Sequence, residues 1–399
     1  MSLPASDLPV LLGAAALVAG VVTSVVVPPL VRLAVAFGAV ERPGAGGRDP
    51  GSIPRLGGVA MVLGVALACG LGAVVRWPVW SQVIPRQELA ALAFGVVLVF
   101  VVGVVDDLVG VSPGQKLLVQ LLAAWLVVRV GWAFHALRLP GLGEIDLGAW
   151  GPLLSIAWVV GVTNAINLVD GLDGLAGGVA AIIAASLLAY SLLQDNQATA
   201  VLLAAVVGAC LGFLWHNWEP ARIFMGDGGS LTLGYLFGAL TLHSSIKAPA
   251  AVAIVVPLLA LGLPVIDTLL VMVLRFFERG GRSLVQRFAR VVRADRSHLH
   301  HALERLVRRR GRIVVVLYVT VLLFCLAALA VALTGQGALG LALLGVEVAV
   351  VVAMRALGFA AGARRLALEQ RDEARRRLPW WREAPAGEAP AGGGITRDS

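Results

Sequence analysis

Residues 313–333 read IVVVLYVTVLLFCLAALAVAL, a run of apolar side chains in which no residue is charged. A helix needs about 20 apolar residues to cross the hydrocarbon core of a bilayer. The run therefore predicts a transmembrane helix, because a helix at the surface of a soluble domain keeps one polar face. The whole chain of 399 residues has the same character, since 59% of its residues are hydrophobic and only 14% are charged. This composition excludes a water-soluble enzyme, a disordered chain and a disulfide-stapled secreted module.

The fold class that the sequence predicts is an all-α polytopic integral membrane protein with about eleven transmembrane helices. The first span has no Lys or Arg before Arg32, so we expect it to be retained rather than removed as a signal peptide. The predicted spans are residues 8–32, 56–75, 88–105, 115–134, 149–169, 174–193, 198–216, 228–246, 250–276, 313–333 and 337–358.

The basic residues are distributed unevenly among the loops. Twelve arginines lie in or next to residues 275–312, and eight more follow residue 359. Lys and Arg concentrate in cytoplasmic loops, so we expect the N-terminus outside, the C-terminus inside and a basic cytoplasmic loop at 275–312. Residues 1–362 would form the transmembrane domain, and residues 363–399 a basic, disordered cytoplasmic tail. The net charge of +8 then reflects topology and anionic lipid headgroups rather than binding of nucleic acid.

Polar clusters fall at the inner ends of the predicted helices, and ionisable side chains there are candidates for function. The first cluster is Asp106-Asp107, at the end of the third span. Adjacent carboxylates repel each other, and carboxylates at a helix C-terminus oppose the helix dipole. We therefore expect a cation to compensate them; the alternative is a pair of solvated acids at a helix end.

The second cluster is a stripe of amides and carboxylates that repeats every three residues. On a helix, this spacing places the four side chains on one face. Gly171 and Gly174 then allow the backbone to turn closely around a ligand. The alternative is a structural ladder of hydrogen bonds between helices. The stripe consists of Asn164, Asn167, Asp170 and Asp173.

The third cluster is the segment from Phe224 to Ser230, FMGDGGS, with Asn217 ten residues before Asp227. A glycine-rich turn that leads into a helix presents backbone N–H groups and the positive end of the helix dipole, which suits a phosphate. Asp227 could equally be a plain N-cap of the helix.

The fourth cluster is Asp295-Arg296-Ser-His298-Leu-His300-His301, in the basic loop. Three histidines could bind zinc, but no further ligands lie nearby in the sequence to complete a tetrahedral set. Interleaved arginines fit a diphosphate better. A solvated basic loop is the alternative.

Two single basic residues also lie at headgroup level, Arg55 in Pro-Arg-Leu-Gly-Gly and Lys116 at the start of the fourth span. Lys116 could meet a lipid phosphate or simply reach to the interface. Carboxylates beside phosphate-binding elements imply Mg²⁺ or Mn²⁺. Phosphoryl transfer requires little beyond alignment and charge neutralisation. The residues alone thus predict metal-dependent phosphate chemistry on a lipid, with the active site on the cytoplasmic face.

The four clusters, in their order and rough spacing from about Arg42 to His301, resemble the polyprenyl-phosphate N-acetylhexosamine-1-phosphate transferases. This family moves a sugar 1-phosphate from a UDP-sugar to undecaprenyl phosphate and releases UMP. The last histidine motif and Arg55 are similar to the WecA and TagO group, which implies UDP-GlcNAc as donor. UDP-MurNAc-pentapeptide is the alternative donor, and a secondary transporter or lipid flippase is the alternative class of protein.

The resemblance also implies roles for individual residues. Asp106 would accept a proton from the lipid phosphate or orient it, with Asp107 beside it. Asp227 would bind Mg²⁺ (or Mn²⁺), and Phe224 would stack on uracil. Direct attack by the lipid phosphate suits these parts, although a covalent Asp intermediate stays open. The implied catalytic residues are Asp106, Asp107 and Asp227, and the implied metal ligands are Asp227, Asn167 and Asp170.

The remaining implied positions bind the substrates. We expect the protein in the cytoplasmic membrane, at the first membrane step of a surface glycan pathway, and a homodimer stays open. The implied substrate-binding residues are Asn164, Asn167, Asp170, Asp173, Asn217, Phe224, Arg296, His298, His300, His301, Lys116 and Arg55.

Overall fold

A computed structural model describes residues 7–36, 53–74, 85–139, 143–246, 248–249, 252–277, 298–304, 306–307 and 309–376. Its first helices are α1 (Asp7–Ala36), α2 (Gly57–Val74), α4 (Arg86–Val109), α5 (Pro113–Arg129), α6 (Trp150–Val169), α7 (Leu175–Leu193), α8 (Gln197–Asn217) and α9 (Gly226–Ile246). They are followed by α10 (Val255–Ala260), α11 (Gly262–Phe277), α13 (Leu299–Glu304), α14 (Arg310–Thr334) and α15 (Gly337–Arg376). A short antiparallel hairpin, β1 (Ala136–Leu139) and β2 (Gly143–Asp146), lies between α5 and α6.

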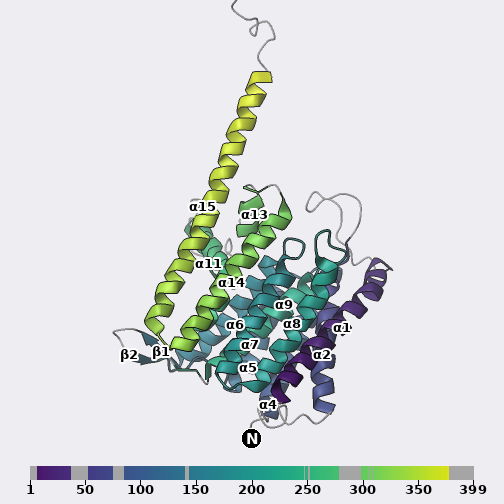
Figure 1. Cartoon of the computed structure of the whole chain (residues 1–399), viewed down its shortest axis with the longest axis vertical. Coiled ribbons are helices and arrows are strands. Elements are labelled where there is room, and N and C mark those ends of the chain that lie inside the picture. Colours follow the sequence, from purple (N-terminus) through teal and green to yellow (C-terminus); the bar gives the residue numbers. More distant parts are fainter. Residues whose placement is uncertain are drawn as a thin grey trace, which may run out of the picture.

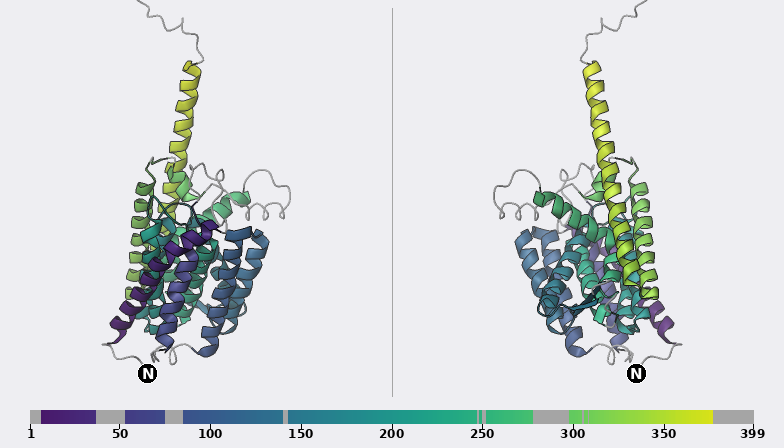
Figure 2. Two further views of the ribbon diagram at one scale, coloured as in Figure 1. Left: turned by 90° about the vertical axis from the view of Figure 1, so that its right-hand side faces the viewer. Right: turned by 90° about the vertical axis from the view of Figure 1, so that its left-hand side faces the viewer.

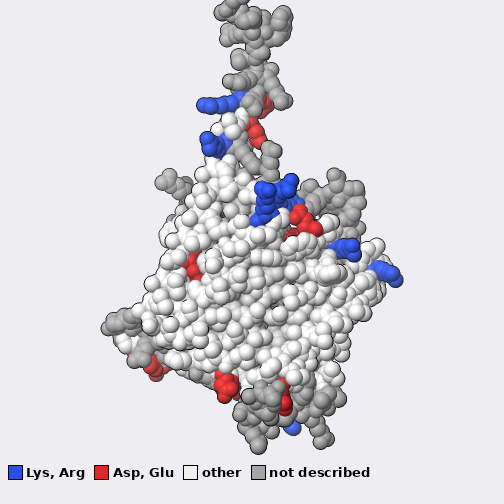
Figure 3. Space-filling model, in the orientation of Figure 1, with Lys and Arg blue, Asp and Glu red and all other residues white. Residues whose placement is uncertain are grey.

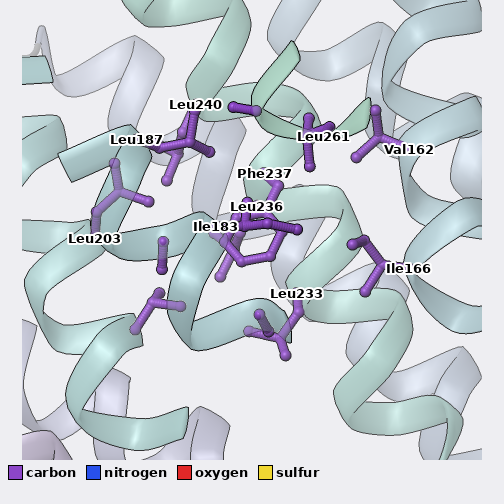
Figure 4. Packing of buried hydrophobic residues seen from close by; sticks show 14 of the residues in the cluster. Val162, Ile166, Ile183, Leu187, Leu203, Leu233, Leu236, Phe237, Leu240 and Leu261 are labelled. Carbon is purple, nitrogen blue, oxygen red and sulfur yellow. The ribbon is translucent and has the colours of Figure 1, made fainter. Parts of the chain in front are cut away.

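The long helices form a bundle around α9, with α15 projecting from one end (Figure 1). Every residue of α9 from Gly228 to Ser245 is buried. Gly234 and Gly238 allow α9 to approach α6 closely, because a Cβ at either position would lie within 3.0 Å of the α6 backbone. Figure 4 shows the apolar side chains of α6, α7, α8 and α9 that pack around this contact. The bundle thereby holds the two ends of α9 in fixed positions.

The outside of the bundle is apolar, as a lipid-facing surface must be. Leu17 of α1 and Leu323 of α14 are 67% and 59% exposed. On the face shown in Figure 3, a broad band of the surface is almost free of charged side chains. Within the described part of the chain, seven helices are long and apolar enough to cross a membrane: α1, α4, α6, α7, α8, α14 and α15. The predicted all-α membrane fold is confirmed.

The other predicted spans correspond to α2, α5, α9 and the pair α10–α11, which fall below that standard in length or hydropathy. The number of eleven spans therefore stays a prediction, as does the direction of insertion. Most Lys and Arg side chains visible in Figure 3 lie toward the end from which α15 projects. This distribution agrees with the expected cytoplasmic position of that end.

Two predicted boundaries differ from the structure. The span 250–276 contains two helices rather than one, and α11 lies obliquely to the bundle (Figure 2). Pro264 accounts for the break at Leu261. In a continuous helix the proline ring would clash with the carbonyl of Ala260, and proline has no N–H to donate to that carbonyl. At the other boundary, α15 continues to Arg376, so residues 363–376 are helical and not the disordered tail expected from 363 onward. Residues 377–399 lie outside the described residues.

Candidate active site

The predicted carboxylates Asp106 and Asp227 meet at one ammonium group. Lys116 Nζ lies 2.8 Å from Asp106 Oδ2 and 2.7 Å from Asp227 Oδ2. The three side chains come from the end of α4, the start of α5 and the start of α9. All three are half-buried, so their charges interact more strongly than they would in water. Lys116 therefore contacts the two carboxylates, a role that the sequence did not indicate.

The turn between α4 and α5 fixes this lysine. Asp106 Oδ1 accepts a hydrogen bond of 2.7 Å from the Val111 N–H. Ser112 and Gln115 form a capping box at the start of α5, one residue before Lys116. The carboxylate and its ammonium partner are thus held by the same short connection.

Asp107 closes the N-terminus of α9. Its Oδ1 accepts a hydrogen bond of 2.8 Å from the Asp227 N–H, and its Oδ2 accepts one of 3.0 Å from the Gly228 N–H. The sequence left open whether this terminus presents its N–H groups to a phosphate or has Asp227 as a plain N-cap; in the structure Asp107 accepts from these two N–H groups. A residue of α4 caps the helix, which leaves the Asp227 side chain facing Lys116.

Gly226 makes this turn possible. Its φ is +72°, a left-handed conformation that side chains rarely adopt. A Cβ at this position would also lie 2.1 Å from the Arg55 carbonyl oxygen and 2.5 Å from an Asp107 carboxylate oxygen. The glycine-rich motif thus serves close packing around Asp227.

The polar stripe on α6 divides between two roles. Asn167 Nδ2 donates to Asp227 Oδ1 at 3.0 Å and to Ser230 Oγ at 2.8 Å. Asn164, one turn deeper, exchanges hydrogen bonds with Gln120 of α5. Asn164 thus forms the interhelical ladder that was the alternative reading, whereas Asn167 faces the carboxylate.

The connection from α6 to α7 carries the other two stripe residues. Asp170 follows the last residue of α6, three positions beyond Asn167. Asp173 Oδ2 accepts a hydrogen bond of 3.1 Å from the Ala221 N–H, in the loop before α9. Asn217 is 4% exposed, accepts from the Gly174 N–H and donates to the Ile223 carbonyl. Asp173 and Asn217 therefore tie this connection to the loop that leads to Asp227.

Phe224 and Arg55 lie in two adjoining segments. The Phe224 N–H donates to the Pro54 carbonyl at 2.7 Å, and its carbonyl accepts from the Gly57 N–H at 2.9 Å. The segment that contains Arg55 thus runs beside the turn that leads into α9. The Phe224 side chain is half-buried.

The end of the histidine motif lies in α13, where His300 packs against the α6–α7 connection. A Cβ added to Gly171 would lie 2.5 Å from His300 Nε2, so this ring covers the glycine next to Asp170. His298 Nδ1 lies 3.0 Å from Asp267 Oδ2, and His301 Nδ1 lies 3.1 Å from Glu304 Oε2. Arg296 lies outside the described residues.

His300 is a neutral side chain in this environment. It is 7% exposed. Burial, followed by the neighbouring His301 and His298, lowers the pKa of His300 to about 3. A neutral imidazole can donate or accept a hydrogen bond but carries no charge toward an anion.

A chain of contacts thus joins all four predicted clusters at one end of the bundle. Asp106 reaches Asp227 through Lys116, Asp227 contacts Asn167, and α6 continues into the turn covered by His300. Sequence reasoning missed Arg355, which pairs with Asp267 behind the histidines. A charged residue close to an apolar run was the signal that could have found it.

A family model described as glycosyl transferase family 4 matches residues 89–245. A probable undecaprenyl-phosphate N-acetylglucosaminyl 1-phosphate transferase of Bacillus subtilis (strain 168) is 33% identical over 317 residues, 79% of this chain and 83% of that protein. The chain belongs to glycosyl transferase family 4. The resemblance drawn from the four motifs is confirmed.

Two further members of this family show its range. A decaprenyl-phosphate N-acetylglucosaminephosphotransferase of Mycolicibacterium smegmatis is 36% identical over 315 residues, 72% of this chain and 74% of that protein. A phospho-N-acetylmuramoyl-pentapeptide-transferase of Limosilactobacillus fermentum is 37% identical over 198 residues, 47% of this chain and 59% of that protein. The family model includes Asp106, Lys116, Asn167 and Asp227 and ends before the histidine helix α13.

Proposed function

We propose that this chain transfers N-acetylglucosamine 1-phosphate from UDP-GlcNAc to undecaprenyl phosphate or a similar polyprenyl phosphate. The products are a polyprenyl-diphosphate sugar and UMP. The observation that carries the proposal is the meeting of Asp106, Lys116 and Asp227 at one end of an apolar bundle. A polar cluster there can take one substrate from water and the other from the bilayer. The cytoplasmic membrane is the expected location, with the cluster on its cytoplasmic side.

In this reaction an oxygen of the lipid phosphate attacks the phosphorus that carries the sugar. The bond from this phosphorus to the bridging oxygen breaks, and UMP leaves with that oxygen. Asp106 would orient the lipid phosphate and take its proton where one is present. Lys116 would neutralise charge on the phosphates that come together, which is the main requirement of phosphoryl transfer. A direct transfer needs no covalent enzyme intermediate.

The cofactor that we propose at Asp227 is a magnesium ion. Two carboxylates share a single lysine, so the cluster retains negative charge that a divalent cation and substrate phosphates can balance. No group of three or more His, Cys, Asp or Glu residues suited to a metal occurs in the described part of the chain. In the proposed site Asp227 and Asp170 would supply only part of the shell of Mg²⁺ (or Mn²⁺), and phosphate and water oxygens would complete it, as Mg²⁺ prefers. Bound there, the ion would neutralise the donor diphosphate.

Asn167 is better suited to orient Asp227 than to bind the metal. Its amide nitrogen, rather than its oxygen, faces both Asp227 and Ser230. Asp107 holds the backbone of Asp227 by accepting a hydrogen bond from its N–H. These two residues would keep the Asp227 carboxylate in one orientation.

The remaining predicted residues would bind the donor. Phe224 would stack on uracil, and Arg55 lies in the adjoining segment. Arg296 and the histidines of α13 would hold the diphosphate or sugar over the α6–α7 connection. Asp173 and Asn217 would support the loops that surround it, because their polar atoms are engaged by backbone groups.

The extent of the matches favours UDP-GlcNAc over UDP-MurNAc-pentapeptide as donor. Relatives named for N-acetylglucosamine transfer match over 67–79% of this chain. Relatives named for muramoyl-pentapeptide transfer match over 47–66% of it. UDP-MurNAc-pentapeptide stays the alternative donor and should be tested beside UDP-GlcNAc.

The test is a donor panel with the purified full-length protein and undecaprenyl phosphate. We expect UMP release and a radiolabelled lipid product with UDP-GlcNAc, loss of both with EDTA, and recovery with Mg²⁺. Product from UDP-MurNAc-pentapeptide alone would overturn the donor assignment. Undiminished activity in EDTA, or in Asp227→Ala, would overturn the metal assignment. Substrate uptake into proteoliposomes without turnover would instead identify a transporter.

A further inference from the structure

Asp267 is a buried carboxylate on α11 that stands outside the proposed reaction. It is 7% exposed. Its oxygens accept hydrogen bonds from Arg355 Nη1 at 2.6 Å and from the Leu299 N–H at 3.2 Å, and they lie 3.0 Å from His298 Nδ1. A buried charge is costly unless it is paired and hydrogen-bonded. Here the pairing joins three helices, α11, α13 and α15.

The histidine helix α13 depends on such contacts. It has six residues, and a helix this short is not stable by itself in water. Asp267 accepts from the N–H of its first residue, Leu299, and thereby caps its N-terminus. On the other side, Gly358 of α15 packs on it so closely that a Cβ would lie 2.5 Å from the Ala302 carbonyl oxygen.

The cap also determines where the histidines lie. His298 is held directly by Asp267, and the ring of His300 lies parallel to that of His298, with an interplanar angle of 7°. His300 in turn covers Gly171, next to Asp170. A shift of α13 would therefore move the histidines away from the α6–α7 connection, while the Asp106–Lys116 pair would keep its own contacts.

We propose that Asp267, held by Arg355, is a positioning residue that seats the histidine helix for binding of the nucleotide diphosphate of the donor. This inference rests on the proposed function for the identity of the donor. It assigns Asp267 to the donor side of the reaction and not to the acceptor lipid. It also gives the long helix α15 a role, since α15 supplies Arg355 and Gly358.

The kinetic test compares Asp267→Asn with wild type in the full-length protein. Asn preserves the shape of the side chain but removes the charge that holds His298 and Arg355. We expect KM for UDP-GlcNAc to rise about tenfold and KM for undecaprenyl phosphate to stay unchanged. Glu369→Gln, on the exposed part of α15, is the matched control and should leave both constants unchanged. A merely structural role would lower the amount of active enzyme without moving either KM, and that result would overturn the proposal.

A second readout does not depend on activity. Diethylpyrocarbonate modifies accessible histidines, and mass spectrometry of peptides gives the rate at each position. His298 and His300 are 5% and 7% exposed, whereas the side chain of His301 is 33% exposed and serves as internal reference. In Asp267→Asn we expect His298 and His300 to react several-fold faster relative to His301. Unchanged relative rates would overturn the proposal.

Arg355 supplies a variant for the case in which Asp267→Asn does not yield folded protein. Arg355→Met should raise the donor KM and the labelling rate in the same direction, and Arg355→Lys should restore both toward wild type. Equal effects of Met and Lys would contradict the ion pair. If wild type releases no UMP from UDP-GlcNAc, the proposed function fails by itself, and the labelling still decides the role of Asp267.

Discussion

The carboxylate of Asp107 accepts hydrogen bonds from the backbone N–H of Asp227 at 2.8 Å and of Gly228 at 3.0 Å, so the end of α4 caps the start of α9. Two adjacent acids in the sequence thus do different things. Asp106 points to the ammonium of Lys116, whereas Asp107 points to the backbone. One of the pair can act on a substrate, and the other sets the position of Asp227.

The two acids should respond differently to substitution. Asp107→Ala removes a helix cap and should lower the free energy of unfolding by about 1–2 kcal/mol, with a fall in kcat. Asp106→Asn should reduce kcat at least about a hundredfold with little change in thermal stability, since it removes the proposed proton acceptor. Thermal unfolding in detergent and UMP release measure both. The assignment fails if Asp107→Ala is as stable as wild type.

Lys116 should be needed for activity as a charge and not only as a spacer. Lys116→Met leaves two half-buried carboxylates without their cation, and we expect kcat to fall about 10²–10³-fold. Lys116→Arg keeps the charge and should retain a measurable part of the rate. If Met and Arg variants are equally active in the UMP assay, electrostatic neutralisation by this residue is excluded.

The two asparagines of α6 should separate stability from catalysis. Asn167→Ala removes the donor to Asp227 and should lower kcat about tenfold. Asn164→Ala breaks the pairing with Gln120 and should lower thermal stability while the kinetic constants stay close to wild type. A variant of Asn164 that folds normally but loses as much activity as Asn167→Ala would contradict this division.

These residues also show what the sequence could predict. The apolar runs were sufficient for the all-α membrane class, because each is long enough to span a bilayer as a helix and the chain has too few charged residues to cover a soluble domain. Spacing identified Asp106, Asn167 and Asp227 as polar groups at one end of the bundle. It could not distinguish the roles of Asp106 and Asp107, since which of two adjacent side chains faces a neighbouring helix depends on where that helix packs.

Other features depend on tertiary contacts that a linear pattern does not contain. The repeat of three residues in α6 suggested one ligand face, but Gln120 from α5 engages Asn164 and leaves Asn167 to the site. Lys116 belongs to no recognisable motif, and only the short turn between α4 and α5 brings it between the two carboxylates. Pro264 indicated the break before α11, yet the length of the apolar stretch 250–276 favoured a single span.

Gly171 should tolerate no side chain, because His300 occupies the space beside it. A Cβ would lie 2.5 Å from His300 Nε2, so Gly171→Ala should displace the ring and raise KM for the donor several-fold. Gly161→Ala, in the preceding helix α6, is the control, since a Cβ at that position would meet nothing within 4 Å. Initial rates over a UDP-GlcNAc series measure the effect. Equal KM values for the two variants would mean that His300 does not contribute to donor binding.

His300 should make the protein less stable in mild acid. Its pKa is lowered to about 3 in the folded state by burial, while the unfolded chain takes up the proton near its ordinary pKa of about 6.5. The unfolded state therefore binds more protons between these values, and stability is lost as pH falls from about 6.5 toward 3. At pH 5.5 the loss from this one group is on the order of 1 kcal/mol relative to pH 8.

His300→Asn removes that proton uptake and keeps a polar side chain of similar size. The fall in unfolding midpoint between pH 8 and pH 5.5 should therefore be smaller in His300→Asn than in wild type, by thermal unfolding in the same detergent. His300→Gln is a second variant without a titratable ring and should show the same smaller fall. The same acid sensitivity in all three proteins would mean that His300 can take up a proton in the folded state, and the packing of α13 on Gly171 would then have to open to water.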